Sequence, residues 1–209
     1  MSGETGAEPL RATLTRVLRA FAEPTEDAVD ALVHHAHVRD YARGEYLLRG
    51  GERATHVMAV LQGLVREHYV DAHGGEHTRS FVREGEVSGS LVDLLSGRPA
   101  MTYVEALEPT RALVFPYAEL DALTAAHPCL AAVVRRSAEA LAVRKTRREH
   151  ELLTKSAEER YAVWRTEHRD LDSRVSRKLV ASYLGITPEH LSRLRARVTR
   201  RVRARSTES

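Results

Sequence analysis

The chain has 209 residues, of which 43% are hydrophobic and 29% are charged, so it can bury one sizeable core and a smaller second domain. No run approaches the ~20 apolar residues of a membrane span, and the first ten residues lack the basic and apolar regions of a signal peptide, so we expect a cytoplasmic protein. The single cysteine, Cys129, excludes an intramolecular disulfide and any cysteine-only iron–sulfur or structural zinc site.

The net charge of +3 is distributed unevenly along the chain. Residues 156–209 hold 13 Lys and Arg against 7 Asp and Glu, whereas residues 1–155 hold 19 against 22. Seven arginines gather near the C-terminus: Arg193, Arg195, Arg197, Arg200, Arg201, Arg203 and Arg205. Such a concentration suits the neutralisation of nucleic-acid phosphates.

The N-terminal part begins with residues 1–9, which we expect to be disordered. Apolar residues then recur at helical spacing over residues 10–21 and 26–33, which predicts two short amphipathic helices separated by Pro24. From about Val38 to Phe115 the pattern changes to short β-type runs separated by glycines. This spacing predicts an antiparallel sandwich or roll.

Helical spacing returns after Pro116. It predicts a short helix over residues 119–125 and a long one over residues 129–153. The long helix carries a heptad-like seam, which indicates a packing helix or a dimer seam: Leu130, Val134, Ser137, Leu141, Arg144 and Arg148. Ser156 followed by Glu159 forms a capping box, which begins a further helix and places a domain boundary near Thr154.

The last predicted helices are joined by a very short turn. Apolar residues from Val175 to Leu184 recur at helical spacing, and Gly185 supplies the permissive backbone of a helix end. Thr187 is a good N-cap and Pro188 suits the first helical position, so a second helix should begin there. Its apolar residues, Leu191, Leu194 and Val198, should face inward, and the polar ones should face out: Glu189, His190, Ser192, Arg193, Arg195 and Arg197. The pattern is that of a helix-turn-helix.

With these motifs the chain resembles the cyclic-AMP receptor/FNR family of bacterial transcription regulators, over roughly residues 10–198. The stretches GEYLLRGGE, VLQGLV and YLGITPEHLSRLR carry the resemblance. It implies an α+β fold with an antiparallel, jelly-roll β-roll of the cyclic-nucleotide-binding type, a long dimerisation helix, and a C-terminal helix-turn-helix of winged-helix type. The expected parts are the disordered residues 1–9, the β-roll with flanking helices at 10–126, the dimerisation helix at 127–154 and the DNA-binding domain with a basic tail at 155–209.

The nucleotide cassette of that family matches residues 85–106. The glutamate that binds the ribose hydroxyl falls on Ser90, and the arginine that binds the cyclic phosphate falls on Ala100, so both charges are missing. Arg98 is a candidate substitute, and the long helix offers Arg147 and Arg148 toward the base. We therefore expect another small ligand, or none, in place of cyclic AMP. The effector-pocket candidates are Gly85, Ser88, Gly89, Ser90, Arg98 and Met101.

The resemblance also implies how the C-terminal helix would read DNA. The DNA-binding candidates are Thr187, Pro188, Glu189, His190, Ser192, Arg193 and Arg197. Hydroxyls and the helix N-terminus suit phosphates, Glu189 can accept from cytosine N4, and Arg193 can fork to guanine O6 and N7. Arg197 is expected to contact the DNA backbone. Family members continue into a hairpin wing, whereas here the chain ends soon after, so the wing should be short or absent.

The sequence thus predicts a homodimeric, sequence-specific transcription regulator that binds a pseudo-palindromic site on double-stranded DNA, with RNA polymerase as a candidate partner and an unknown effector. No catalytic triad, P-loop or dinucleotide fingerprint occurs, so we expect neither enzymatic activity nor a cofactor. Two alternatives remain open. One is a metal-dependent cupin enzyme, suggested by the histidines at 34, 35 and 37, although no complete ligand pattern follows. The other is a signalling module that binds a protein partner and no DNA.

Overall fold

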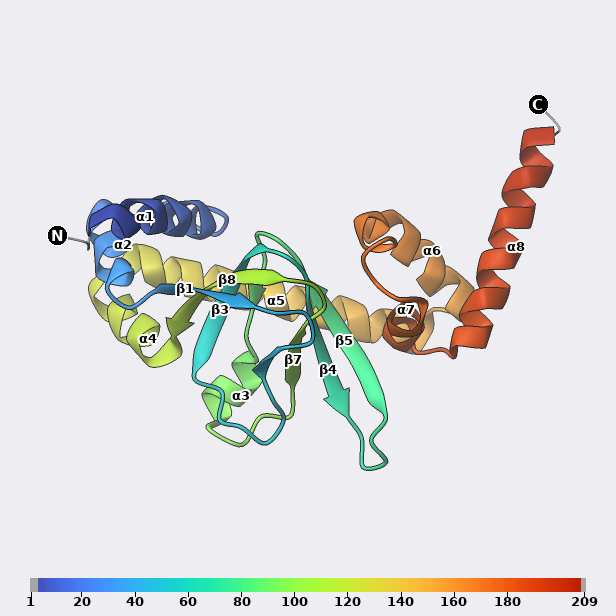
Figure 1. Ribbon diagram of the computed structural model, residues 1–209, viewed down its shortest axis with the longest axis horizontal. Helices are drawn as coiled ribbons and strands as arrows, with labels where there is room; N and C mark the ends of the chain where they lie inside the picture. The colour runs from blue at the N-terminus through green and yellow to red at the C-terminus, as the bar shows by residue number, and fades with distance from the viewer. Residues whose placement is uncertain (1–3, 208–209) are drawn as a thin grey trace.

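The computed structural model describes the backbone of residues 4–207 and the side chains of residues 9–198. Two antiparallel sheets form a roll, helices flank it, and the long helix α5 leads to a group of C-terminal helices (Figure 1). The strands are β1 His37–Tyr41, β2 Tyr46–Leu48, β3 His56–Gln62, β4 Val65–Val70, β5 Glu76–Val82, β6 Val87–Ser88, β7 Tyr103–Ala106 and β8 Thr110–Pro116. The helices are α1 Glu4–Arg19, α2 Glu26–Val33, α3 Leu91–Ser96, α4 Tyr117–Ala126, α5 Pro128–Thr154, α6 Ala157–Glu167, the 3-10 helix η1 Arg169–Leu171, α7 Arg177–Leu184 and α8 Pro188–Thr207. The α+β fold class is confirmed.

The roll is built from two four-stranded sheets, in the orders β1-β8-β3-β6 and β2-β7-β4-β5. Strand alternation gives β8 two apolar faces. Ala112 and Val114 point between the sheets, where they meet Val60 and Val104 in the inner core. Leu113 and Phe115 point outward into a second core beneath the helices. The continuous apolar run of β8 is thus explained by burial on both sides.

The second core joins the outer face of the first sheet to the N-terminal helices and the beginning of α5. Leu14, Leu32, Leu113 and Leu130 are at most 1% exposed there. Helix α1 begins at Glu4, so the expected disorder is wrong for residues 4–9, while residues 1–3 lie outside the described part. Leu10 is the first side chain that packs in this core, and no apolar period marks the helical turns before it.

Helix α5 packs against its own chain with the face on which the sequence places a seam. Leu130 and Val133 are buried, and Val134, Ser137 and Leu141 are half-buried. This stripe is therefore a packing seam of the monomer. Exposed residues follow at spacings of four, three, four and three on another face, which is the spacing of a coiled-coil seam: Glu139, Val143, Thr146, His150 and Leu153.

The C-terminal helices form a third core, and the roll contributes to it. Trp164, Leu171, Leu184 and Leu191 are at most 1% exposed, and Leu64 and Phe81 of the roll complete the cluster. The predicted capping box at the beginning of α6 is present, since Ser156 and Glu159 bond each other reciprocally. In the described residues α8 continues as one helix through Thr207.

Candidate nucleic-acid interface

Helices α7 and α8 are joined by the three-residue turn 185–187. The hydroxyl of Ser176 accepts from the N–H of Leu179 and caps α7. Gly185 ends α7 in the left-handed conformation, at φ 67°, where other residues are strained. The hydroxyl of Thr187 then accepts from the N–H of His190 at 3.2 Å, so α8 begins at Pro188 as the local sequence predicts.

The inner and outer faces of α8 differ sharply. Leu191 and Leu194 are 1% and 2% exposed, and Val198 packs beside them. The outer face holds six of the seven DNA-binding candidates as exposed side chains: Thr187, Pro188, Glu189, Ser192, Arg193 and Arg197. Hydrogen bonds from its own backbone N–H and from Thr187 lower the pKa of Glu189, and Arg193 acts in the same direction, so Glu189 is ionised at neutral pH. α8 lies at one end of the molecule, away from the roll (Figure 1).

Two polar residues of α8 lie differently from the sequence prediction. His190 is half-buried. Arg195, expected to point outward, bonds Asp172 at 3.5 Å and helps to fix α8 to the loop before α7. The side chains of the four arginines from Arg200 to Arg205 lie outside the described part of the chain.

Helix α7 packs beside β5, which is an edge strand of the second sheet. Strand β5 is the last strand of its sheet, so its outer N–H and C=O groups need partners. The hydroxyl of Ser182 accepts from the N–H of Thr78 at 2.8 Å and donates to the carbonyl of Glu76 at 3.1 Å. One serine side chain thus supplies two hydrogen bonds of the kind that a neighbouring strand would make to β5. These bonds hold α7, and with it α8, against the roll.

Charged pairs reinforce this docking from two sides. Arg83 of the roll donates to both carboxylate oxygens of Asp170 at 2.7 Å. Arg174 bonds Glu84 and Glu108, both on the roll, at 2.7 and 2.6 Å. Arg147 and Arg148, expected near the effector pocket, point instead to the C-terminal helices: Arg147 pairs with Glu167, and Arg148 lies over the ring of Tyr183 and donates to its carbonyl.

The interior of the roll contains a buried polar cluster that the sequence prediction missed in part. The carboxylate of Glu67 accepts from Ser80 at 2.6 Å and from Ser88 at 3.0 Å. Arg79 lies 3.9 Å from the same carboxylate and donates to the hydroxyl of Thr102 at 3.4 Å. Sequence reasoning missed Glu67, because it stands between Arg66 and His68 in β4 and its partners come from distant strands.

The other end of this cluster meets helix α5. The hydroxyl of Ser90 lies 3.0 Å from that of Thr102. Burial raises the pKa of Asp93, but hydrogen bonds from Ser90, Met101 and Thr102 outweigh it and lower the pKa overall. Burial and then Arg79 lower the pKa of Lys145 on α5, while Glu67 and Asp93 oppose this change, so Lys145 lies in the field of the cluster.

The effector-pocket candidates do not form one site. Ser88 and Ser90 are 1% and 2% exposed and belong to the polar cluster. Gly85 and Gly89 form turns with positive φ, whereas Arg98 is exposed and Met101 is 63% exposed. Ala100 is buried, and the buried hydroxyls and carboxylates of the cluster bond one another.

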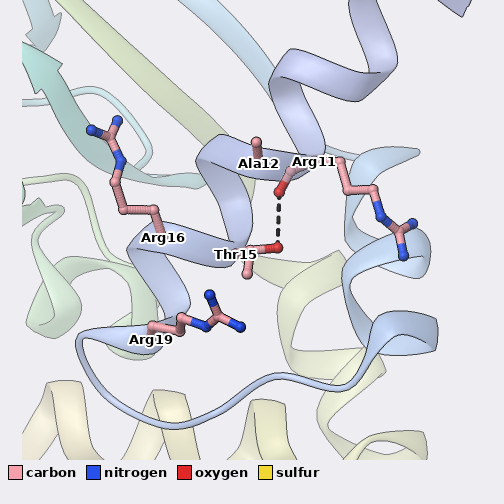
Figure 2. Close-up of a pocket in the computed structure, with 5 residues that line it drawn as sticks. All are labelled: Arg11, Ala12, Thr15, Arg16 and Arg19. Atoms are coloured by element: carbon pink, nitrogen blue, oxygen red, sulfur yellow. Dashed lines mark hydrogen bonds between the residues drawn. The ribbon is translucent and has the colours of Figure 1, made fainter.

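A second basic surface lies on α1, where Arg11, Arg16 and Arg19 line a hollow of about 380 Å³ with Ala12 and Thr15. Figure 2 shows the three guanidinium groups pointing in different directions, and the hydroxyl of Thr15 bonds the carbonyl of Arg11. Arg11 pairs with Asp30 and Arg19 with Glu23. This surface lacks the convergent donors that an anion site needs.

Neither a metal centre nor a membrane span is found in the residues that the structure describes. No group of three or more histidine, cysteine or acidic residues among them could hold a metal ion. The histidines near the roll entrance have separate partners: His34 bonds the carbonyl of Asp30, and His35 lies 3.7 Å from Glu119. No helix in this part of the chain is long and apolar enough to cross a bilayer.

Comparison with known proteins agrees with this architecture. Residues 38–127 match the family model of the cyclic nucleotide-binding domain. The chain is 25% identical over 186 residues to the fumarate and nitrate reduction regulatory protein of Vibrio cholerae, covering 82% of this chain and 71% of that protein. It is 29% identical over 186 residues to the transcriptional activator protein anr of Pseudomonas aeruginosa, covering 80% and 72%.

The fold is also found in a solved structure, that of FixK2 from Bradyrhizobium japonicum. The two superpose with a TM-score of 0.69 at 22% sequence identity, over 79% of this chain and 85% of FixK2. The chain thus shares its fold with FixK2. Residues 38–127 thus form a cyclic nucleotide-binding domain, and the chain is homologous to the FNR- and anr-type regulators.

Proposed function

We propose that the protein is a transcription regulator that binds double-stranded DNA in a sequence-specific manner as a homodimer, with the first turns of α8 in the major groove. The observation that carries this proposal is the contrast between the two faces of α8. Leu191 and Leu194 fix the helix to its core, and the opposite face offers a carboxylate, hydroxyls and two arginines to solvent. Such groups read base edges and contact phosphates.

Within this proposal the residues have separate roles. Thr187, Ser192 and the N–H groups at the beginning of α8 contact phosphates, because a helix N-terminus attracts anions. Glu189 accepts from cytosine, Arg193 forks to guanine, and Arg197 contacts the backbone. Pro188 and His190 shape and support the first turn.

A homodimer would present two copies of α8 about 34 Å apart, which matches successive major grooves of a pseudo-palindromic site. The exposed seam on α5 from Glu139 to Leu153 supports this assembly, because Val143 and Leu153 are 68% and 77% exposed in the monomer. The stripe from Leu130 to Leu141 already packs against the protein's own chain. The exposed seam from Glu139 to Leu153 is therefore the face of α5 that a second copy would contact.

We further propose that cyclic AMP does not control this regulator. Ser90 and Ala100 offer no charge at the two positions that would hold ribose and phosphate, and the interior of the roll is occupied by Glu67 with its hydroxyl partners and by Arg79, which lies 3.9 Å from the Glu67 carboxylate. A phosphate buried without a paired arginine would cost several kcal/mol, since ~3 to 5 kcal/mol are lost when one partner of a buried pair is removed.

The test is selection of bound sequences from random duplex DNA, followed by binding measurements with the Arg193→Ala variant. The variant should lose about 1 to 3 kcal/mol on the selected site and relax discrimination at one base pair per half-site. Arg43→Ala, which removes an exposed arginine from the turn after β1, is the control and should bind normally. An equal loss on selected and random DNA would contradict base reading, and a salt slope near zero would contradict DNA binding altogether.

A further inference from the structure

A recess lies on the outer side of the first sheet, separate from the polar cluster inside the roll. It has a volume of about 100 Å³ and is lined by residues of α1, α2, β3, β6, α3, β8, α4 and α5. Phe21, Val57, Val87, Phe115, Val134 and Ala138 are among the residues that line it. Six of the sixteen lining residues are buried and the other ten are half-buried, so the recess is partly open to solvent.

The lining is apolar in its chemistry. No charged side chain contributes to it, and its two polar residues are Ser137 and Tyr117. The hydroxyl of Ser137 already donates to the carbonyl of Val134 on its own helix, at 2.8 Å. An ion placed there would lose its hydration without gaining a partner, whereas an apolar molecule would leave water without such a loss.

The volume limits the size of the occupant. A cavity of about 150 Å³ lined by leucine, isoleucine and phenylalanine stays dry in a well-studied protein and binds benzene or xenon. The recess here has similar walls and a somewhat smaller volume. A single six-membered ring or a short alkyl chain fits this size, and a nucleotide does not.

The position of the recess connects it with the parts that the proposed function uses. Phe21 lies two residues after the end of α1, and Arg136 of α5 donates to its carbonyl at 2.6 Å, so a hydrogen bond beside the recess joins this segment to the long helix. Val134 and Ala138 face the recess, and the exposed seam of α5 lies on another face of the same helix. Val87 faces the recess while its neighbour Ser88 bonds Glu67 inside the roll.

We propose that this recess is a binding site for a small neutral apolar molecule of the size of a benzene ring. A bound molecule contacts α1, the first sheet and α5 at once, and it stabilises the packing of the long helix against the roll. The site is distinct in position and in chemistry from the polar interior of the roll.

Benzene is the probe, and benzoate, which has the same ring with a negative charge, is the matched control. At about ten times its Kd, benzene should raise the melting temperature of the full chain by about 3 °C, and benzoate should leave it unchanged. Ala138→Leu adds three carbon atoms to the wall and should abolish the rise. Ala140→Leu, on an exposed position of the same helix, should retain it.

A second measurement does not depend on the stability of the variants. In methyl NMR spectra of the unmodified chain, benzene should shift the methyl signals of Val87 and Val134 and leave those of the exposed Val143 unchanged. Absence of both the thermal rise and these shifts overturns the proposal, as does a rise that Ala138→Leu retains. Neither readout involves DNA, so this proposal and the proposed function fail independently.

Discussion

Phe81 is expected to hold the C-terminal helices on the roll, and Phe81→Ala tests this. The ring lies on β5 and is 8% exposed. Its centroid is 5.7 Å from that of Trp164, in an edge-to-face arrangement, and 5.6 Å from that of Tyr183. Its neighbour Val82 faces the inner core, so the truncation leaves the packing of the roll in place.

The expected cost is about 3 to 5 kcal/mol, which is usual for truncating a buried phenylalanine, and the two ring contacts favour the upper part of this range. The remaining links cannot compensate. Partly exposed ion pairs such as Arg83–Asp170 each contribute about 0 to 1 kcal/mol. Most of the loss should therefore fall on the docking of α6, α7 and α8.

The assay is urea unfolding followed by two probes. Trp164 is the single tryptophan of the chain and is 1% exposed, so its fluorescence reports on the C-terminal helices, while far-UV circular dichroism reports on the whole chain. In Phe81→Ala the fluorescence transition should move to lower urea and separate from the other. Tyr69→Ala, which truncates a side chain that is 39% exposed on β4, should leave both transitions together. Coincident transitions with a loss below about 1 kcal/mol would refute the reasoning.

Three further predictions concern pH, backbone strain and assembly. Burial, then Arg66, lowers the pKa of His68 to about 4 from 6.5. The unfolded chain therefore binds more protons than the folded chain between these pH values, and the free energy of unfolding falls as the pH drops through them. From pH 7.5 to 5 the loss due to His68 should be about 2 kcal/mol in urea unfolding, and His68→Phe should not show it. At Gly63, with φ 99°, an added Cβ would lie 2.7 Å from the carbonyl oxygen of Pro109, so Gly63→Ala should lower the free energy of unfolding by more than about 2 kcal/mol. The control is Gly51→Ala: Gly51 has φ 87° but open space around it, and the loss should be about 1 kcal/mol in the same experiment. Val143→Asp should convert the proposed dimer to a monomer in sedimentation without lowering the melting temperature of the monomer by more than about 1 °C; an unchanged dimer would exclude the outer seam of α5.

Local chemistry accounts for the parts of the structure that the sequence predicts well. Helix α2 spans Glu26–Val33 as its apolar period indicates, and α8 begins at Pro188 because Thr187 caps it. The exposed face of α8 follows from helical spacing alone, since Leu191 and Leu194 determine which side is turned inward. These features depend on residues within a few positions of one another.

The polar cluster inside the roll is harder to predict from the sequence. Ser88 and Ser90 were identified from a family pattern, but Glu67, Arg79 and Lys145 meet them only through strand pairing and the docking of α5. No local pattern marks those partners, because they are far apart in the chain. The two arginines expected at the pocket, Arg147 and Arg148, miss it since the helix turns them toward Glu167 and Tyr183.

The sequence by itself determined the order of the elements, the turn between α7 and α8, and the polar face of α8, because caps, periodicity and glycine positions act over short distances. Only the tertiary structure decided which face of α5 is free, how Ser182 and Phe81 fix the C-terminal helices to β5, and where the apolar recess lies. These features arise where surfaces remote in sequence meet, and their burial is known only once the chain has folded.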